Sequence, residues 1–184
     1  MKQIIFVRHG ETDQNIAELS LRKANIRHMP GFKEENAPLN STGIEQAKRT
    51  AQELKDTRID VIFCSSLQRA RQTADIINEF HNVSIFEKDN LQERNSGDYV
   101  GAAFHELFDF DKNIKNDNIE SIKEFTDRIY SAMEEIINTN YDNIAIVAHG
   151  GVHHAIRTYC LKLPLKGNIR VDKVPNGGIR FYTA

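Results

Sequence analysis

Three short apolar runs stand out along the chain and predict buried strands. They are QIIFV at 3–7, IDVIFCSS at 59–66 and NIAIVAHGG at 143–151. Apolar and polar residues do not alternate in these runs, which is typical of strands that helices cover on both faces. Weaker strand patterns occur at 83–86 and, after the turn sequence PNGG, at 179–183.

Apolar residues at helical spacing follow these strands and fill the segments between them. The predicted helical faces are Ile44, Ala47, Ala51 and Leu54; Leu67, Ala70, Ala74 and Ile77; Ile122, Phe125, Ile129, Met133 and Ile136; and the stretch VHHAIRTYCL at 152–161. The spacing of Thr42 and Glu45 is that of a capping box at the start of the first of these helices. Alternating strands and helices predict an α/β fold, a three-layer sandwich whose mostly parallel central sheet has helices on both faces.

Two segments fit neither period. One is 24–40; the other, at 97–118, carries an apolar cluster of Phe104, Leu107, Phe108 and Phe110 that we expect to pack in the core or in a lid. Long connections within a compact domain often form lids or binding loops.

Composition narrows the class of protein. A length of 184 residues predicts one domain, 1–184, and 40% apolar with 27% charged residues is typical of a soluble globular protein. The net charge of −2 does not suggest a nucleic-acid-binding face, and no apolar run is long enough for a signal peptide or a membrane span. We therefore expect a cytoplasmic protein with no nucleic-acid or membrane partner, in which Cys64 and Cys160 are free thiols.

Candidate chemistry follows the ends of the three best strands. Arg8 and His9 follow the first, Arg69 comes shortly after the second, and His149 and Gly150 follow the third. Parallel sheets bind ligands outside the carboxyl ends of their strands, so we expect these side chains to converge. Arginine matches phosphate oxygens best and carboxylates next, which makes a phosphate group the favoured ligand and a carboxylate the alternative.

Histidines beside arginines suggest covalent chemistry at that phosphate. Neighbouring positive charge keeps an imidazole neutral, and a neutral imidazole can attack phosphorus. A carboxylic acid must then protonate the leaving oxygen and later take a proton from water. The candidates for this acid are Glu11, Glu93 and Glu106.

Six blocks in order carry a resemblance to a known family. They are RHGETDQN (8–15), APLNSTGIEQA (37–47), CSSLQRARQTA (64–74), LQERNSGDYVG (91–101), IESIKEFTDRI (119–129) and VAHGG (147–151). In this order they resemble the signatures of the histidine phosphatase superfamily, the phosphoglycerate-mutase-like proteins.

The resemblance implies an activity and a set of roles. His9 would be the nucleophile that becomes phosphohistidine, and Glu93 the proton donor and acceptor. The residues implied to bind the phosphoryl group are Arg8, Arg69, His149, Asn15 and, through its N–H, Gly150. The family carries out this chemistry without a metal or an organic cofactor, so the implied activity is that of a metal-independent, histidine acid-type phosphatase acting on a small phosphorylated substrate.

Three departures from the family pattern bear on the type of activity. Gln14 stands where a tryptophan is frequent, the stretch IRHMPGFKEEN (26–36) lacks the usual Gly-x-x-Asp, and the segment 101–120 is short beside the insertions of mutases. A short lid suits hydrolysis of a phosphate monoester. The alternatives are a phosphoglycerate-mutase-type transfer and a noncatalytic phosphate-binding module. The physiological substrate and the oligomeric state do not follow from the sequence.

Other polar residues have simpler interpretations. His153 and His154 are neighbours on a predicted helix, so they cannot chelate one metal together, and we expect surface or packing positions. Arg71 is expected to pair with a carboxylate on a helix face. The basic residues Arg22, Lys23, Arg27, His28 and Lys33 form either a solvated face or a region that selects the substrate.

Overall fold

A five-stranded sheet forms the centre of the computed structural model, which describes residues 1–29, 36–170 and 172–184. Its strands are β1 (Gln3–Arg8), β2 (Val61–Ser65), β3 (Ile85–Lys88), β4 (Asn143–Ala148) and β5 (Ile179–Thr183), in the order β3-β2-β4-β1-β5. Neighbouring strands pair in parallel except β5, which is antiparallel to β1. The predicted, mostly parallel sheet is confirmed.

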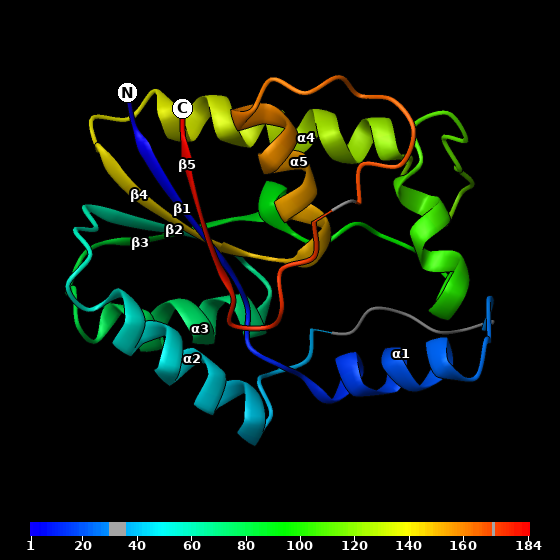
Figure 1. Ribbon diagram of the computed structural model, residues 1–184, viewed down its shortest axis with the longest axis horizontal. Helices are drawn as coiled ribbons and strands as arrows, with labels where there is room; N and C mark the ends of the chain where they lie inside the picture. Colours follow the sequence, from blue (N-terminus) through cyan, green and yellow to red (C-terminus); the bar gives the residue numbers. More distant parts are fainter. Residues whose placement is uncertain (30–35, 171) are drawn as a thin grey trace.

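Helices cover both faces of this sheet (Figure 1). The helices α2 (Ser41–Leu54) and α3 (Gln68–Asn78) lie on one face, and α4 (Ile122–Ile137) and α5 (Gly150–Cys160) on the other. Alternate residues of β1 enter two separate cores: Ile4 and Phe6 pack with the α4 and α5 residues, whereas Ile5 and Val7 pack with those of α2 and α3. These two cores are the physical reason for the continuous apolar runs, and the three-layer architecture is confirmed.

The helix α1 (Asp13–Lys23) lies apart from the main layers and has no buried residue. Thr12 caps it by accepting a hydrogen bond from the backbone N–H of Asn15. Two 3-10 helices, η1 (Asp89–Leu91) and η2 (Gly101–Phe108), complete the elements, and α1 packs against η2. Within η2, Leu107 and Phe108 are buried in the core on the α4 side, as expected for the apolar cluster of the second long connection.

The predicted inner face of α2 was wrong at its start. Asn40 caps this helix by accepting from the N–H of Gly43, and the expected capping box of Thr42 and Glu45 does not form the cap. Gly43 is buried against the backbone of the loop after β1, where an added Cβ would lie 2.1 Å from Glu11 O. The buried face therefore runs through Gly43 and Ala47, and Ile44 points outward with 38% exposure.

Smaller expectations also have clear outcomes. The strand expected at 83–86 lies at 85–88, on an edge of the sheet, and Phe86 is exposed. Arg71 pairs with Asp75 at 2.9 Å and with Glu87 at 2.7 Å, as predicted. Cys64 and Cys160 are free thiols. Lys33 and part of the segment 24–40 lie outside the described residues.

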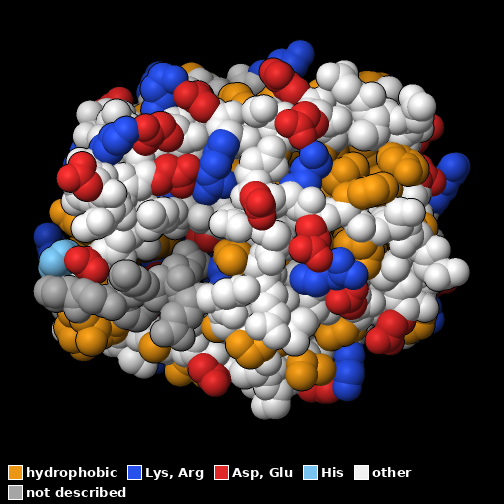
Figure 2. Space-filling model, turned by 180° about the vertical axis from the view of Figure 1, so that it is seen from behind, with side chains coloured by type: hydrophobic (Ala, Val, Ile, Leu, Met, Phe, Trp, Pro, Cys, Tyr) orange, Lys and Arg blue, Asp and Glu red, His pale blue; other side chains and the backbone are white. Residues whose placement is uncertain are grey.

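The outer surface mixes both signs of charge. Acidic and basic side chains are interspersed over the face seen in Figure 2, in keeping with a net charge of −2. Among the helices in the described ranges, none is both long and apolar enough to span a bilayer.

Candidate active site

Backbone contacts hold the loop after β1 at the carboxyl edge of the sheet. His9 donates its N–H to Ala148 O at 2.9 Å, and Gly10 donates its N–H to Thr73 Oγ1 at 3.1 Å. A Cβ on Gly10 would lie 2.3 Å from Gly43 O, so only glycine fits where this loop crosses the start of α2. The sheet and α2 and α3 together therefore determine where the His9 ring lies.

The hydrogen bonds of His9 define its tautomer. Nδ1 lies 2.6 Å from Gly10 O, and because a carbonyl oxygen can only accept, Nδ1 carries the proton. Nε2 accepts from Arg69 Nε at 3.3 Å, so the lone pair is on Nε2. Burial, then the charges of Arg69 and Arg8, hold the pKa of His9 well below its ordinary value. The buried ring is a neutral imidazole with an available lone pair.

A second histidine lies beside the first. His149 ends β4 and precedes α5, and its ring centroid is 5.0 Å from that of His9. Its Nε2 pairs with Ser65 Oγ at 2.8 Å, whereas its Nδ1 is buried with no hydrogen-bond partner among the described residues. Burial, followed by the charge of Arg69, lowers the pKa of His149 as well. Two neutral imidazoles thus lie next to two arginines at the carboxyl edge of the sheet.

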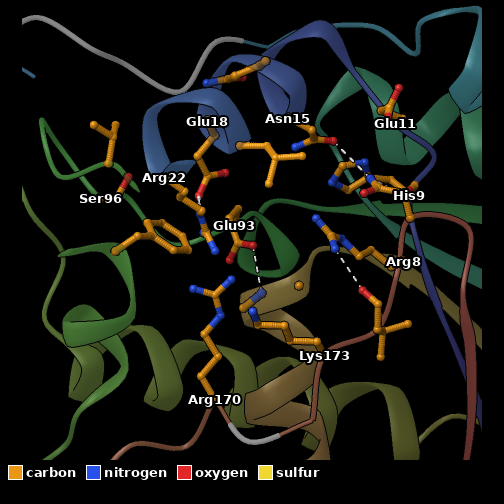
Figure 3. Close-up of a pocket in the computed structure, with 18 of the residues that line it drawn as sticks. Arg8, His9, Glu11, Asn15, Glu18, Arg22, Glu93, Ser96, Arg170 and Lys173 are labelled. Atoms are coloured by element: carbon orange, nitrogen blue, oxygen red, sulfur yellow. Dashed lines mark hydrogen bonds and ion pairs between the residues drawn. The ribbon is translucent and has the colours of Figure 1, made fainter. Parts of the chain in front are cut away.

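A cavity of about 270 Å³ opens beside these residues (Figure 3). Five of the seven residues expected at the site line it: Arg8, His9, Asn15, Glu93 and Gly150. Arg69 is buried and contacts His9 directly, and His149 packs against the His9 ring, so both adjoin the cavity through His9.

Arg8 and the start of α5 form one wall of this cavity. Arg8 donates from Nη1 to Val174 O at 2.9 Å, and its Nε is buried with no partner among the residues described. A Cβ on Gly150 would lie 3.6 Å from Arg8 Cζ, which places the guanidinium against the amino end of α5. Burial lowers the pKa of Arg8, against the effect of Glu93. Positive charge and the amino end of a helix therefore meet at this wall.

Two backbone N–H groups hold the Glu93 carboxylate in the cavity. Gly151 donates to Oε2 at 2.8 Å, and Arg94 donates to Oε1 at 2.9 Å. A Cβ on Gly151 would lie 2.2 Å from Oε1, so the carboxylate occupies space that only a glycine leaves open. The Arg94 side chain is fully buried and donates from Nε to Glu120 O at 2.8 Å, which fixes the loop that carries Glu93.

The other two carboxylate candidates are placed differently. Glu11 accepts from Asn40 Nδ2 at 3.2 Å, and Figure 3 shows its side chain turned away from Arg8 and Glu93. Glu106 lies on η2, 4.0 Å from Lys112 Nζ, and does not line the cavity. Glu11 lines the cavity as well, so the choice of Glu93 rests on its carboxylate, which the N–H groups of Gly151 and Arg94 hold in the cavity.

Among the other residues that line the cavity, the sequence did not assign Arg22, Arg170, Lys173 or Asn176 to the catalytic site. Asn176 donates from Nδ2 to His9 O at 3.1 Å and to Asn15 Oδ1 at 3.0 Å. It belongs to the sequence PNGG, which indicated only a turn. Arg22 belongs to the basic stretch that the sequence offered as a solvated face or a region that selects the substrate, and nothing in the pattern around Arg170 or Lys173 marked them.

His153 and His154 are both buried. Of the two predicted positions, packing is confirmed and the surface is wrong. His153 Nε2 lies 2.6 Å from Tyr182 OH on β5, and its ring lies against Phe6. His154 lies edge-on to Phe108, with ring centroids 5.9 Å apart, and lines the cavity. Burial is the largest cause that lowers the pKa of His153 to about 4 and that of His154 to about 3.

Comparison with known proteins identifies the family. A family model described as the histidine phosphatase superfamily, branch 1, matches residues 4–180. The chain belongs to the histidine phosphatase superfamily. Among relatives in this superfamily, the Bacillus subtilis protein named "Uncharacterized phosphatase PhoE" is 37% identical over 160 residues, which cover 86% of this chain and 77% of the relative.

Two further matches agree with this assignment. The adenosylcobalamin/alpha-ribazole phosphatase of Salmonella typhimurium is 29% identical over 170 residues, covering 86% of this chain and 79% of that protein. A mycobacterial glucosyl-3-phosphoglycerate phosphatase, solved with VO3, has the same fold, with a TM-score of 0.80, 22% identity, and coverage of 98% and 90% of the two chains. The chain is a phosphatase-type member of the superfamily.

Proposed function

We propose that the protein hydrolyses phosphate monoesters through a covalent phosphohistidine on His9. The observation that carries this proposal is the tautomer of His9. With Nδ1–H donated to Gly10 O, Nε2 is the nitrogen with the lone pair, and it can attack phosphorus when Arg69 turns its hydrogen bond to the phosphoryl group. Because its pKa lies well below the ordinary value, the imidazole stays neutral and nucleophilic at neutral and mildly acidic pH.

The phosphoryl group is held by donors that surround His9. Arg8, Arg69 and the N–H of Gly150 supply positive charge and hydrogen bonds to its oxygens. Asn15 uses Oδ1 to accept from Thr12 and Asn176, so its Nδ2 is the atom that donates to a phosphoryl oxygen. On binding, a phosphoryl oxygen replaces His9 Nε2 as the acceptor for Arg69, and it gives a partner to His149 Nδ1, which has none among the described residues.

The reaction then takes two balanced steps. In the first, His9 Nε2 forms a bond to phosphorus while the ester P–O bond breaks, and protonated Glu93 gives its proton to the leaving oxygen. In the second, water attacks phosphorus, Glu93 takes a proton from that water, and the P–N bond breaks. Inorganic phosphate leaves, and His9 regains its neutral form. No step needs a metal or an organic cofactor.

The experiment uses the purified protein with p-nitrophenyl phosphate and, separately, with 3-phosphoglycerate at pH 6 and pH 7.5. We expect phosphate release from both esters and an acid-labile phosphoryl adduct on the protein. His9→Ala should lose at least about 10⁴-fold in kcat and lose the adduct, as is typical when a nucleophile is removed. Arg71→Gln, a surface arginine paired with Asp75 and Glu87, is the matched control.

Three results would contradict the proposal in different ways. Turnover by His9→Ala at the wild-type rate would show that another residue attacks phosphorus. Conversion of 3-phosphoglycerate to an isomer without phosphate release would indicate a mutase. Phosphate binding without turnover of any ester would indicate a noncatalytic module.

A further inference from the structure

We propose that Arg170 and Lys173, together with Arg22, form a second anion-binding subsite that selects phosphate monoesters whose leaving group carries another negative charge. This inference rests on the proposed function, because it names the substrate class of the same cavity. The subsite lies at the end of the cavity where the leaving group, not the transferred phosphoryl group, would be.

The arrangement of the cavity residues gives the direction of the substrate. Figure 3 shows Arg170 on the side of the cavity away from His9, with the Glu93 carboxylate between them. A phosphoryl group on His9 would present its leaving oxygen to Glu93. The rest of the leaving group would then extend toward Arg170 and Lys173, both of which line the cavity.

The Arg170 guanidinium contacts two aromatic rings, and no carboxylate among the described residues pairs with it. Its Cζ lies 5.0 Å from the centroid of Phe104 and 5.7 Å from that of Phe108. No hydrogen bond or ion pair joins this guanidinium to another described residue, and the side chain is half-buried. None of its nitrogens is among the buried atoms that lack a partner, so the guanidinium opens onto the cavity and can pair with an anion that enters it.

The nearby carboxylates already have other partners. Glu18 pairs with Arg22, and the Glu93 oxygens accept from the backbone N–H groups of Gly151 and Arg94. Arg22 Cζ also lies 5.2 Å from the centroid of the Phe104 ring, which Arg170 contacts too. Positive charge is therefore in excess at this end of the cavity.

The repulsion among these cations is reflected in their titration. The charge of Arg170 is the largest cause that lowers the pKa of Lys173, ahead of burial and of Arg22. Burial, followed by Arg22, lowers the pKa of Arg170 to about 10. Both groups still carry their charge at neutral pH, and a bound anion would relieve the repulsion between them.

The backbone around Arg170 is anchored before any ligand binds. Arg170 donates its N–H to Asn168 Oδ1 at 2.9 Å, Asn168 donates from Nδ2 to His105 O at 2.7 Å, and Ile169 donates to Phe108 O at 3.0 Å. With the segment fixed to η2 and the guanidinium stacked on Phe104, little side-chain ordering remains to oppose binding. A guanidinium fork held in this way suits a carboxylate or a phosphate.

The test compares matched esters that differ only in the second charge. 3-Phosphoglycerate and glycerol 3-phosphate differ by a carboxylate in place of a hydroxymethyl group. Propane-1,3-diol bisphosphate and its monophosphate differ by a second phosphate. We expect kcat/KM to be at least tenfold higher for the charged member of one pair, and the pair that shows the preference identifies the group that binds.

Variants assign this preference to the subsite. Arg170→Gln and, independently, the exposed Lys173→Gln should each reduce the ratio of kcat/KM between charged and uncharged esters several-fold or more. Effects on the overall rate or on the amount of folded protein cancel in that ratio. Arg71→Gln is the matched surface control and should keep the wild-type ratio.

The outcomes separate this inference from the proposed function. A wild-type ratio near one in both pairs, with His9-dependent phosphate release intact, would overturn the subsite alone. A strong preference that neither variant changes would overturn it too, since other residues would then bind the anion. Absence of hydrolysis for every ester would instead overturn the proposed function, and the subsite with it.

Discussion

A single methyl group on Gly151 should disable proton transfer while leaving the nucleophile untouched. Gly151→Ala would place a Cβ 2.2 Å from Glu93 Oε1 and 2.9 Å from the Phe108 ring. The Phe108 ring is fully buried in the core and cannot retreat easily, so the Glu93 carboxylate is the group that moves.

The size of that movement sets the expected loss. Ordinary contact begins at 3.4 Å, so Oε1 must shift by about 1.2 Å, the difference between 3.4 and 2.2 Å. A displacement of about 1 Å from the productive geometry costs about 10²-fold in rate, and losing a general acid altogether costs about 10²- to 10⁴-fold. We therefore expect kcat for an alkyl phosphate to fall by about 10²-fold or more.

The assay depends on the leaving group. In the proposed mechanism an alkoxide, a poor leaving group, needs a proton from Glu93, whereas p-nitrophenolate leaves without one. Gly151→Ala should therefore lose far more activity on glycerol 3-phosphate than on p-nitrophenyl phosphate, and formation of the phosphohistidine adduct from the latter should persist. The first turnover measures this difference, because release of the alcohol reports phosphorylation of His9 alone, whereas phosphate release also includes hydrolysis of the adduct, which needs Glu93 for both esters.

The neighbouring glycine offers a matched control. A Cβ on Gly150 would have its nearest contact at 3.6 Å, with Arg8, so Gly150→Ala keeps its N–H and has room for the methyl group. Its losses should be small and equal for the two esters. Equal losses in the first release of the alcohol from both esters in Gly151→Ala, or no loss at all, would refute the assignment of Glu93 as the proton donor.

Stability should depend on pH through the buried histidines and on sequence at the loop after β1. With the pKa of His153 at about 4 and of His154 at about 3, both stay neutral in the folded protein while the unfolded chain takes up protons below about pH 6.5. The free energy of unfolding is thus highest above pH 6.5 and should fall by up to about 1.4 kcal/mol per histidine for each pH unit below it. Urea unfolding at pH 7.5 and 5.0 measures this, and an unchanged midpoint would argue against neutral buried rings. Gly10→Ala, whose Cβ would lie 2.3 Å from Gly43 O, should cost about 1–3 kcal/mol of unfolding free energy, and a wild-type thermal midpoint would show that the two loops can separate freely.

The sheet was predictable because burial on both faces leaves a clear trace in the sequence. The runs at 3–7 and 143–151 are apolar throughout because alternate residues enter different cores. The face of α2 was misplaced at Ile44 because its true start depends on the contact of Gly43 with Glu11, a residue on another element. Helical periodicity carries no information about such a contact. The 3-10 helix η2 was missed because burial of Leu107 and Phe108, not a regular period, holds it in place.

The residues of the candidate site that follow strand ends or belong to motifs could be predicted from the sequence. Arg8, His9 and Gly150 lie at the carboxyl edge because β1 and β4 are parallel neighbours. Arg170, Lys173 and Asn176 belong instead to the connection between α5 and β5. That connection lies along the cavity because β5 pairs antiparallel with β1. No local sequence pattern predicts where such a connection runs.

This connection contacts both ends of the cavity. It explains how the fold can keep one reaction at phosphorus while the preference for a leaving group changes. At one end its backbone accepts from Arg8 through Val174 O, and Asn176 donates to His9 O. At the other end it is tied to η2 through Asn168 and carries Arg170. In the proposed binding mode, the phosphoryl group meets side chains from strand ends and helix starts, which pack on the two cores. The leaving group would meet η2 and this connection, which have little regular structure. Substitutions there should therefore change which ester is accepted before they change how phosphorus is attacked.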